Sequence, residues 1–459
     1  MATVKDQGSA AESGSRLIQV TPGQGVRGTA FVPPDKSLSH RAAMLGAIAE
    51  GTTVVRSFLT ALDTLATLDC LRALGVEVAG PKDGTVIIKG RPGSSGAGAG
   101  FDEPDHVLDA GNSGTTLRLL AGLAAPHPIF WVATGDASLR RRPMGRVIEP
   151  LERMGARIMA RRGGLAPLAI TGGALSGIVW RTSVASAQVK SAILLAGLQA
   201  RGLTRVEEPA QSRDHTERML AFFGAELRRG EGWAELQGPQ RLRGRTVTVP
   251  GDPSSAAFFW VAAAILPGSE VRTPEVGLNP TRIEVLRVLE EMGAEVDVRP
   301  APERGPEPAG DVTVRGPSEL RAVRIEGRRV PLLIDELPVL AVAALHARGT
   351  SQIRDAAELR YKESDRIDAL AHELRQLGFS VETFPDGLGI SGPQRALGGE
   401  AWSHGDHRLA MALVVAALAG KRPSVVKGTE CIETSFPGFA AAMDRLARPG
   451  NARVVEQPA

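Results

Sequence analysis

A short segment that reads as the end of a helix, a glycine and the start of a strand recurs along the whole chain. One copy is Leu289-Glu290-Glu291-Met292-Gly293-Ala294, followed by the strand-like residues Glu295 to Val298. Glycine suits the left-handed residue that commonly ends a helix, so each copy predicts a helix that turns directly into a strand. The glycines of the five clear copies are Gly75, Gly155, Gly224, Gly293 and Gly378, and Met443 to Gly450 resembles a degenerate sixth.

Alanine-rich helices with small or polar residues at their start alternate with these copies. They are apolar nearly all round, which predicts that each one is buried. The interval between units is too long for a solenoid repeat. The pattern instead favours six small α+β units gathered into two lobes of three. The expected helices are Ser39 to Ala49, Gly114 to Ala125, Ser186 to Ala200, Ser254 to Ile265, Asp335 to His346 and Asp406 to Leu418.

Two proline-rich segments, each followed by a buried helix, mark where the chain is expected to cross between the lobes. These lobe crossings are Val32-Pro33-Pro34 and Val249-Pro250-Gly251-Asp252-Pro253. The predicted domains are a flexible tail at 1–15, lobe 1 formed by 16–34 plus 253–459, and lobe 2 formed by 35–252. The cleft between the lobes is the expected site, because ligand pockets favour domain interfaces.

The composition narrows the class of protein. The chain has 459 residues, of which 43% are hydrophobic, enough for more than one core, and its 54 basic residues nearly balance its 51 acidic ones. This balance disfavours a nucleic-acid binder. Two cysteines, Cys70 and Cys431, fit a reducing compartment better than a disulfide framework. No uncharged apolar run reaches the roughly 18–20 residues of a membrane helix. We therefore expect a soluble cytoplasmic protein without a targeting peptide.

Two motif matches are expected to be accidental. Gly23-Gln24-Gly25-Val26-Arg27-Gly28 matches a dinucleotide fingerprint, but a strand and a turn follow it where that site needs a helix. His404-Gly405-Asp406-His407 has no third cluster of ligands nearby in the sequence, which disfavours a zinc site. The sequence therefore predicts no metal and no dinucleotide cofactor.

Polar and cationic residues stand at the start of several of the apolar helices. Helix starts present free N–H groups and a partial positive charge, so their convergence on one cleft would attract anions. Ser37, Asn112, Ser186 and Asp406 are equally suited to be simple helix caps. Likewise, Arg140 to Arg142 suit a solvated loop, and Lys362 to Arg366 suit an exposed helix start. Asp335 differs, because it is predicted to lie where an apolar strand meets an apolar helix, and a carboxylate there needs a partner or a function.

Ten segments in order along the chain resemble the 5-enolpyruvylshikimate-3-phosphate synthase family. The resemblance covers about residues 17 to 445. The segments are PPDKSLSHRA (33–42), GNSGTTLRLL (111–120), GDASLRRRPMGRV (135–147), SAQVKSAILLAGL (186–198), SRDHTERML (212–220), PGDPSSAA (250–257), LIDELPVLAVAA (333–344), RYKESDRI (360–367), DHRLAMAL (406–413) and TSFPGF (434–439).

The resemblance implies an α/β fold with two lobes of three βαβαββ units each, an inside-out α/β barrel with the active site in the cleft. It implies transfer of the enolpyruvyl group of phosphoenolpyruvate to the 5-hydroxyl of shikimate 3-phosphate. Phosphate is released, and the product serves chorismate and aromatic amino-acid synthesis in the shikimate pathway. It further implies that no metal or organic cofactor takes part. We expect a monomer that acts on these two small molecules, without nucleic-acid or membrane partners.

The resemblance also implies roles for individual residues. Asp335 is the expected base, and Glu363 and Lys36 are the expected proton-transfer groups. Shikimate 3-phosphate is expected to bind Lys36, Ser37, Arg41, Ser186, Gln188, Arg213, Asp335 and Lys362. Phosphoenolpyruvate is expected to bind Lys36, Gly114, Arg142, Gln188, Arg366 and Arg408.

The sequence departs from parts of the family pattern. Some members carry Lys where this chain has Thr434, so one phosphoenolpyruvate contact is open. Glyphosate-tolerant members often carry Ala at the position of Gly114, so we expect room for glyphosate here.

Two alternatives remain. A UDP-N-acetylglucosamine enolpyruvyl transferase shares the architecture, but usually has Lys-Asn at the Lys36-Ser37 position and often a loop cysteine. A non-catalytic anion-binding protein on the same scaffold would not need Asp335, Lys362 and Glu363.

Overall fold

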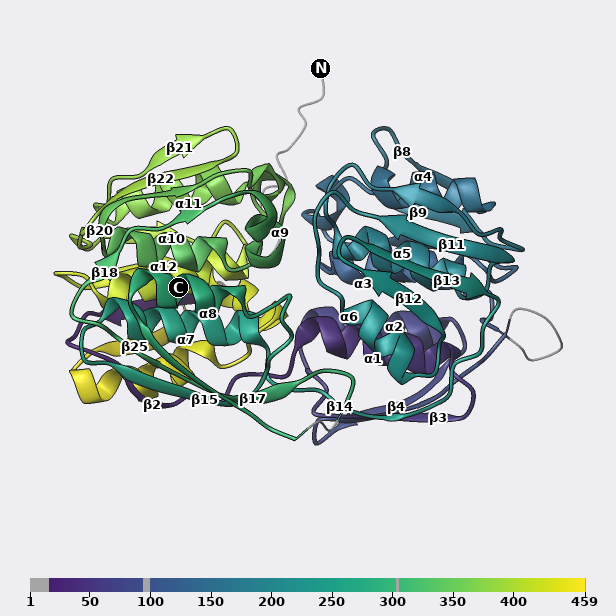
Figure 1. Cartoon of the computed structure of the whole chain (residues 1–459), viewed down its shortest axis with the longest axis horizontal. Coiled ribbons are helices and arrows are strands. Elements are labelled where there is room, and N and C mark those ends of the chain that lie inside the picture. Colours follow the sequence, from purple (N-terminus) through teal and green to yellow (C-terminus); the bar gives the residue numbers. More distant parts are fainter. Residues whose placement is uncertain (1–15, 94–99, 303–304, 459) are drawn as a thin grey trace, which may run out of the picture.

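The computed structural model describes residues 16–93, 100–302 and 305–458. The tail predicted at 1–15 lies outside the described residues. The described chain forms two lobes side by side, each with strands outside and helices inside (Figure 1). No helix among these residues is both long and apolar enough to span a membrane.

Lobe 2 contains one continuous stretch of the chain. Its helices are α1 (Lys36–Ile48), α2 (Leu62–Ala73), α3 (Gly114–Ala124), α4 (Gly145–Met154), α5 (Ala187–Gly197) and α6 (His215–Phe222), with the 3-10 turn η1 (Leu139–Arg141). Its strands are β3 (Thr52–Arg56), β4 (Glu77–Lys82), β5 (Thr85–Lys89), β6 (Leu108–Asp109), β7 (Phe130–Thr134), β8 (Arg157–Arg161), β9 (Leu165–Thr171), β10 (Val179–Arg181), β11 (Gly202–Glu207), β12 (Leu227–Gly230), β13 (Trp233–Gly238) and β14 (Thr246–Thr248).

Lobe 1 combines the two ends of the described chain. Its helices are α7 (Pro253–Ile265), α8 (Glu284–Met292), α9 (Val330–Leu333), α10 (Leu337–Leu345), α11 (Arg366–Gln376), α12 (His407–Leu418) and α13 (Phe439–Ala447), with the 3-10 turns η2 (Gly327–Arg329), η3 (Ala357–Tyr361), η4 (Thr429–Thr434) and η5 (Arg448–Gly450). Its strands are β1 (Arg16–Thr21), β2 (Arg27–Thr29), β15 (Glu270–Gly277), β16 (Glu295–Pro300), β17 (Ala309–Arg315), β18 (Leu320–Arg321), β19 (Arg324–Ile325), β20 (Ala347–Ile353), β21 (Glu382–Phe384), β22 (Gly387–Gly392), β23 (Glu400–Trp402), β24 (Ser424–Lys427) and β25 (Arg453–Pro458).

The six sheets formed by the described residues share one order of strands, which confirms the predicted βαβαββ unit. In the unit β6-α3-β7-α4-β8-β9 the strands lie in the order β6-β7-β9-β8. The first pair is parallel and the other two pairs are antiparallel. Three units complete their sheets with a strand from a distant part of the chain. In these units β14 pairs with β3, β2 pairs with β15, and β1 pairs with β24 and β25. These pairings tie the ends of each lobe together.

The glycines that the sequence placed at helix ends have the predicted left-handed conformation. Gly155 and Gly293 follow α4 and α8 with φ of 117° and 106°. Gly75, Gly224 and Gly378 also have positive φ. In the sixth unit it is Asn451, with φ of 60°, that has this conformation. Asparagine is one of the few other residues that tolerate it.

Each lobe has its own hydrophobic core. One core draws on residues 18–30 and 256–454, and the other on residues 38–249. In lobe 1 every residue of α7 is buried, including Phe258 and Trp260. Burying a side chain of that size contributes about 1.5–3 kcal/mol. The separate cores support the lobe boundaries at 35 and 252, which we retain as a proposal.

One element differs from the prediction. The segment before Asp335 was expected to be a strand, but Val330–Leu333 forms the short helix α9. Its buried residues Val330 and Leu333 pack into the lobe 1 core. A short apolar run carries no periodicity that separates a strand from a buried helix, so tertiary packing decided this element.

The contact between α3 and α5 generates a test of core packing. A Cβ on Gly122 of α3 would overlap the backbone carbonyl oxygen of Ala192 in α5. Alanine normally favours a helix over glycine by about 1 kcal/mol. Overpacking costs about 1–3 kcal/mol, and two backbones cannot yield as a flexible side chain can. We therefore expect Gly122→Ala to lower the free energy of unfolding, measured by urea denaturation.

Gly145→Ala is the matched control, because a Cβ at Gly145 in the first turn of α4 meets no atom within 4 Å. It should leave stability unchanged or slightly higher. Equal stability of the two variants would show that α3 and α5 do not pack as closely as described.

Candidate active site

Six buried helices begin around one cavity between the lobes. The cavity has a volume of about 230 Å³. Its lining includes a residue from the start of each helix, or from the two positions before it: Lys36 (α1), Gly114 (α3), Ser186 (α5), Asp252 (α7), Asp335 (α10) and His407 (α12). The helix starts therefore converge as the sequence predicted, and their N–H groups favour an anion in the cavity.

The structure brings all but one of the predicted site residues to the cavity lining. These residues are Lys36, Ser37, Arg41, Gly114, Arg142, Ser186, Gln188, Arg213, Asp335, Lys362, Glu363 and Arg408. The exception is Arg366, which is 1% exposed. Its guanidinium lies behind the cavity and donates to Asp406 at 2.8 Å, Glu363 at 2.6 Å and Asp335 at 3.4 Å.

Asp335 lies among cations from both lobes. Arg213 of lobe 2 donates to its carboxylate at 2.6 Å, and Arg408 of lobe 1 donates to its backbone carbonyl at 3.1 Å. Burial by itself would raise the pKa of Asp335, but Arg408, Arg213, Lys362 and Arg366 together hold it well below its usual range. The carboxyl is therefore ionised at neutral pH in the substrate-free protein.

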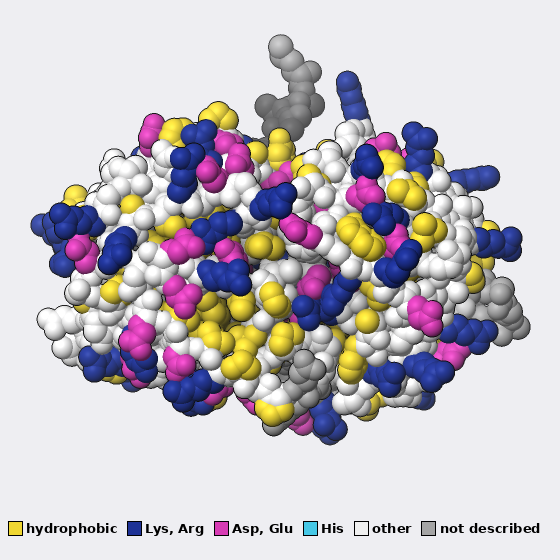
Figure 2. Space-filling model, viewed as in Figure 1, with side chains coloured by type: hydrophobic (Ala, Val, Ile, Leu, Met, Phe, Trp, Pro, Cys, Tyr) yellow, Lys and Arg dark blue, Asp and Glu magenta, His cyan; other side chains and the backbone are white. Residues whose placement is uncertain are grey.

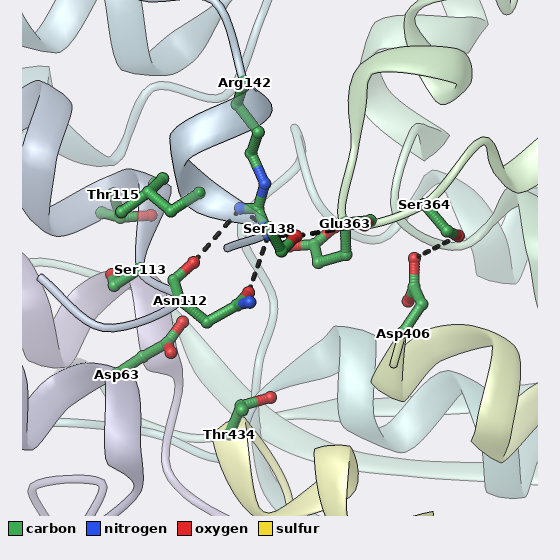
Figure 3. A network of polar contacts seen from close by, with 12 residues as sticks. Asp63, Asn112, Ser113, Thr115, Ser138, Arg142, Glu363, Ser364, Asp406 and Thr434 are labelled. Carbon is green, nitrogen blue, oxygen red and sulfur yellow. Dashed lines mark hydrogen bonds and ion pairs between the residues drawn. The ribbon is translucent and has the colours of Figure 1, made fainter. Parts of the chain in front are cut away.

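Glu363 is the second carboxylate held between cations. Arg366 donates to it at 2.6 Å, and Arg142 of the opposite lobe lies 3.6 Å from it. Burial would raise its pKa, but Arg366, Arg142 and Lys36 hold the pKa well below the usual range. The backbone carbonyl of Glu363 also accepts from Ser138 at 3.2 Å, which ties the two lobes together here (Figure 3).

Arg142 is held in place by the loop before α3. It donates to the backbone oxygen of Asn112 at 3.2 Å, to its side-chain oxygen at 2.7 Å, and to Ser138 at 3.1 Å (Figure 3). Asn112 is thus not the cap of α3. Ser113 is the cap, and accepts from the N–H of Thr116 at 3.0 Å.

The other three predicted caps can also be judged from the structure. Asp406 caps α12 by accepting from the N–H of Arg408 at 2.9 Å. Ser186 caps α5, because its hydroxyl accepts from the N–H of Val189 at 3.5 Å. This agrees with the sequence prediction of a simple helix cap. Ser37 does not cap α1, because Asp35 accepts from the N–H of Leu38 at 2.9 Å. Ser37 is left to face the cavity.

Arg41 and Lys362 carry charge without a close carboxylate. Arg41 donates to Thr216 at 2.7 Å, Ser191 at 2.9 Å and the backbone of Ser37 at 3.0 Å, all of them neutral oxygens. Burial lowers the pKa of Arg41 to about 10 and also lowers that of Lys362. Neither makes an ion pair with another described residue. Both charges are therefore available to an anion.

Sequence reasoning missed several residues of the cavity. Asp63 at the start of α2 lies 2.5 Å from the Lys36 ammonium. Arg118 of α3 donates to Gln188 at 2.8 Å, and a Cβ on Gly114 would lie against its guanidinium. A charged residue within an apolar helix was the available signal for Arg118. His407 was named in the sequence only as part of a weak metal motif, and it also lines the cavity. Burial and the cations Lys36 and Arg408 lower its pKa well below 6.5, so the ring is neutral.

Thr434 stands apart from this cluster. Its hydroxyl donates to the backbone oxygen of Cys431 at 2.7 Å, and the described lining of the cavity does not include it. In Figure 3 it lies away from Arg142 and Glu363. Within the described residues, no group of three His, Cys, Asp or Glu side chains could hold a metal ion.

The lining carries a surplus of positive charge. Nine Lys and Arg side chains face five Asp and Glu side chains. At the mouth, Arg146 of α4 pairs with Glu358 of η3 through two bonds of 2.8 and 2.9 Å. Figure 2 shows basic and acidic side chains next to each other along the boundary between the lobes. The arrangement fits small substrates with several negative charges.

The comparisons with known proteins decide the family. The family model of EPSP synthase (3-phosphoshikimate 1-carboxyvinyltransferase) matches residues 20–443. The chain belongs to the EPSP synthase family. The 3-phosphoshikimate 1-carboxyvinyltransferase of Desulforudis audaxviator is 54% identical over 431 residues, covering 94% of this chain and 99% of that protein. The enzyme of the same name from a Synechococcus species is 51% identical and covers 96% and 99% of the two chains.

Solved structures agree with this EPSP synthase assignment. The EPSP synthase of Acinetobacter baumannii is 43% identical with a TM-score of 0.83, covering 96% of this chain and 100% of that one. The enolpyruvyl transferase NikO of Streptomyces tendae has a TM-score of 0.76 at 19% identity, over 97% and 100% of the chains, and shows the fold alone. The predicted family, two-lobe fold and enzyme class are confirmed over both alternatives.

The depressed pKa of Asp335 makes a stability prediction. We expect Asp335→Asn to lower the free energy of unfolding by about 3 kcal/mol at pH 7, because the cations around Asp335 lose a buried partner. The pKa of Asp335 in the folded protein lies below its unfolded value of about 3.9. The stabilisation that its carboxylate gives to the folded state is therefore fully present above that pH and is lost as the pH falls toward the folded pKa. The stability gap between wild type and variant should therefore narrow below about pH 3.9. Urea denaturation from pH 7 to pH 3 measures this gap.

Asp69→Asn is the control, because the side chain of Asp69 is 70% exposed. It should stay close to wild type over the whole pH range. A gap for Asp335→Asn that is equally wide at pH 3 and pH 7 would contradict the electrostatic account.

Proposed function

We propose that the cavity binds phosphoenolpyruvate and shikimate 3-phosphate side by side and transfers the enolpyruvyl group to the 5-hydroxyl of shikimate 3-phosphate. The observation that carries this proposal is the meeting of Asp335, Glu363 and Lys36 in one cavity lined mostly by cations. Lys36 belongs to lobe 2 and the two carboxylates belong to lobe 1. The reaction therefore depends on both lobes.

The charge of the substrates suits the lining. A phosphate monoester carries about −1.5 to −2 at pH 7, and each substrate adds a carboxylate, so roughly five negative charges enter the cavity. In the substrate-free protein the cations are partly held by carboxylates, as in the Arg213–Asp335 and Arg142–Glu363 pairs. Incoming phosphate and carboxylate oxygens replace those partners, and arginine binds them through two parallel bonds.

We assign shikimate 3-phosphate to the lobe 2 side of the cavity and to the residues that reach it from lobe 1. Arg41 supports this assignment, because its guanidinium has only neutral partners among the described residues. Ser37 faces the cavity free of a capping role. The proposed ligands are Lys36, Ser37, Arg41, Ser186, Gln188, Arg213, Asp335 and Lys362.

We assign phosphoenolpyruvate to the neighbouring cations, with Gly114 allowing its backbone N–H to approach an anion. A Cβ at Gly114 would overlap the guanidinium of Arg118 and would lie in ordinary contact, at 3.4 Å, with that of Arg142. Arg366 is proposed to turn from Glu363 or Asp335 toward the substrate, since all its present partners are carboxylates. The proposed ligands are Lys36, Gly114, Arg142, Gln188, Arg366 and Arg408. Room for glyphosate beside Gly114 stays a prediction.

The chemistry is an addition followed by an elimination. A proton is delivered to the methylene carbon of phosphoenolpyruvate, C2 becomes electrophilic, and the 5-oxygen attacks C2 while Asp335 accepts the hydroxyl proton. The tetrahedral intermediate then loses phosphate from C2 and a proton from the methyl carbon. Lys36 and Glu363 are proposed to give and take the proton at that carbon. Positioned acid–base groups of this kind contribute about 100- to 10,000-fold each.

Substrate binding is proposed to tune Asp335 for its role. A carboxylate with a strongly depressed pKa is a poor base, and four cations hold the pKa of Asp335 low in the free protein. Once those cations bind phosphate and carboxylate groups, their effect on Asp335 is partly cancelled. Its pKa then rises toward the range where a general base is effective. The base is thus activated only when the substrates are present.

Closure of the lobes is proposed to exclude water from the intermediate. Contacts across the cleft support a closed arrangement: Arg146 pairs with Glu358 at the mouth, and Ser138 donates to Glu363 deeper inside. Action as a monomer, in the cytoplasm and without nucleic-acid or membrane partners stays a prediction from composition and resemblance.

An assay of phosphate release tests the function. We expect the purified protein to release phosphate from phosphoenolpyruvate with shikimate 3-phosphate, and not with UDP-N-acetylglucosamine. Asp335→Asn should remain folded and lose about 100- to 10,000-fold in kcat, because it lacks the general base. Circular dichroism of the same samples verifies the fold.

The exposed Asp69→Asn variant should retain wild-type turnover. Release with the sugar nucleotide alone would refute the substrate assignment. Near-normal turnover of Asp335→Asn would remove Asp335 from the mechanism while leaving the overall reaction in place.

A further inference from the structure

One buried arginine holds both lobe crossings. Arg282 lies in lobe 1 between β15 and α8 and is 1% exposed. It donates to Asp35, directly after the first crossing, at 2.8 Å and to Asp252, within the second crossing, at 2.8 Å. The crossings are also bonded to each other, since Asp35 N–H donates to Pro250 at 2.8 Å and Asp252 N–H donates to Pro33 at 2.9 Å.

The two aspartates cap the helices that follow the crossings. Asp35 accepts from the N–H of Leu38 at 2.9 Å at the start of α1. Asp252 accepts from the N–H of Ser254 at 2.8 Å at the start of α7, and from the N–H of Lys36 at 3.4 Å. The first turn of α1, which carries Lys36, is therefore oriented by two carboxylates that share one guanidinium.

Without Arg282 these carboxylates would face each other in a buried place. They are 1% and 6% exposed. Burial and the neighbouring Asp35 raise the pKa of Asp252, whereas Arg282 counters burial and keeps the pKa of Asp35 lowered. Arg282 is the cation that both share, and removing it would leave buried like charges without their common partner.

Arg282 also reaches lobe 2 at the start of α6. Its guanidinium lies 2.9 Å from His215 Nε2, and His215 Nδ1 lies 2.7 Å from Glu307. Since an arginine N–H can only donate, the network assigns Nε2 as the acceptor and places the ring proton on Nδ1, directed at Glu307. His215 is two residues from Arg213, so the same guanidinium steadies the segment that carries this predicted substrate ligand.

A fourth contact leads toward Asp335. Arg282 donates to the hydroxyl of Ser254 at 2.7 Å, and that hydroxyl donates to Glu336. Glu336 in turn accepts from Arg213 at 3.4 Å. Because Glu336 is adjacent to Asp335 in the chain, this buried relay connects the crossings to the proposed base.

We propose that Arg282 is a positioning residue that sets Lys36 of lobe 2 against Asp335 of lobe 1. The inference rests on the proposed function, because it assigns those two side chains to the same reaction. Arg282 acts through the helix caps and through Ser254, without contacting the Lys36 ammonium or the Asp335 carboxylate among the described contacts. Its planar fork serves four partners, which the single ammonium of lysine cannot reproduce.

Two variants and a control test this role. We expect Arg282→Lys to lose about 100-fold in single-turnover rate at saturating substrate, the cost of a displacement of about 1 Å, and to lose less than this in its affinity for shikimate 3-phosphate. Ser254→Ala removes only the relay to Glu336 and should lose about tenfold in that rate. Arg329→Met is the matched control, since Arg329 pairs with Glu284 and Glu291 in lobe 1 away from the crossings. It should turn over normally.

The readouts separate positioning from mere stability. Calorimetry gives the affinity for shikimate 3-phosphate, rapid-quench single turnover gives the chemical rate, and thermal unfolding gives stability. A folded Arg282→Lys with a wild-type rate overturns the proposal. So does a loss confined to affinity, which would make Arg282 a substrate ligand. If Arg282→Lys fails to fold, Ser254→Ala decides alone, and a wild-type rate there overturns the proposal.

The wild-type enzyme separates this inference from the proposed function. Absence of phosphate release from wild type with both substrates refutes the function itself. Normal release from wild type together with undiminished rates in the variants refutes only the role of Arg282.

Discussion

Helices that are apolar on every face are stable only inside a core, and the first N–H groups of such helices then need partners elsewhere. In this chain six such helices begin at the boundary between the lobes and bring their starts to one cavity. The partial positive charge of each start adds to the Lys and Arg side chains there. The same constraint therefore builds both cores and concentrates positive potential where the substrates are proposed to bind.

The carboxylates of the cavity offset part of that potential in the absence of substrate. Asp335, Glu363 and Asp63 each lie within reach of a cation, so these three carboxylates are paired without a ligand. The partners are exchangeable, because phosphate and carboxylate oxygens offer arginine the same geometry. Two of these carboxylates are also the proposed proton-transfer groups. Stability of the empty cleft and activity of the filled one thus draw on the same side chains.

A small buried cluster joins the two lobes at the crossings. Arg282 joins the caps of α1 and α7 and touches the start of α6. The first turn of α1, which carries Lys36, begins at this cluster. The contact between the lobes and the placement of a proposed reacting group therefore share the same buried carboxylates.

The sequence by itself determined the local features, the units and the family. Left-handed glycines, apolar helices and the ten family segments depend on neighbouring residues. Every site residue that they predicted lines the cavity except Arg366, which the structure buries behind it. The sequence could not distinguish strand from helix before Asp335, and it did not identify Asp35 and Ser113 as the caps in place of Ser37 and Asn112. It missed Asp63, Arg118 and Arg282. Arg282 meets Asp35 across 247 positions of the chain, and only the packing of one lobe against the other creates such a contact.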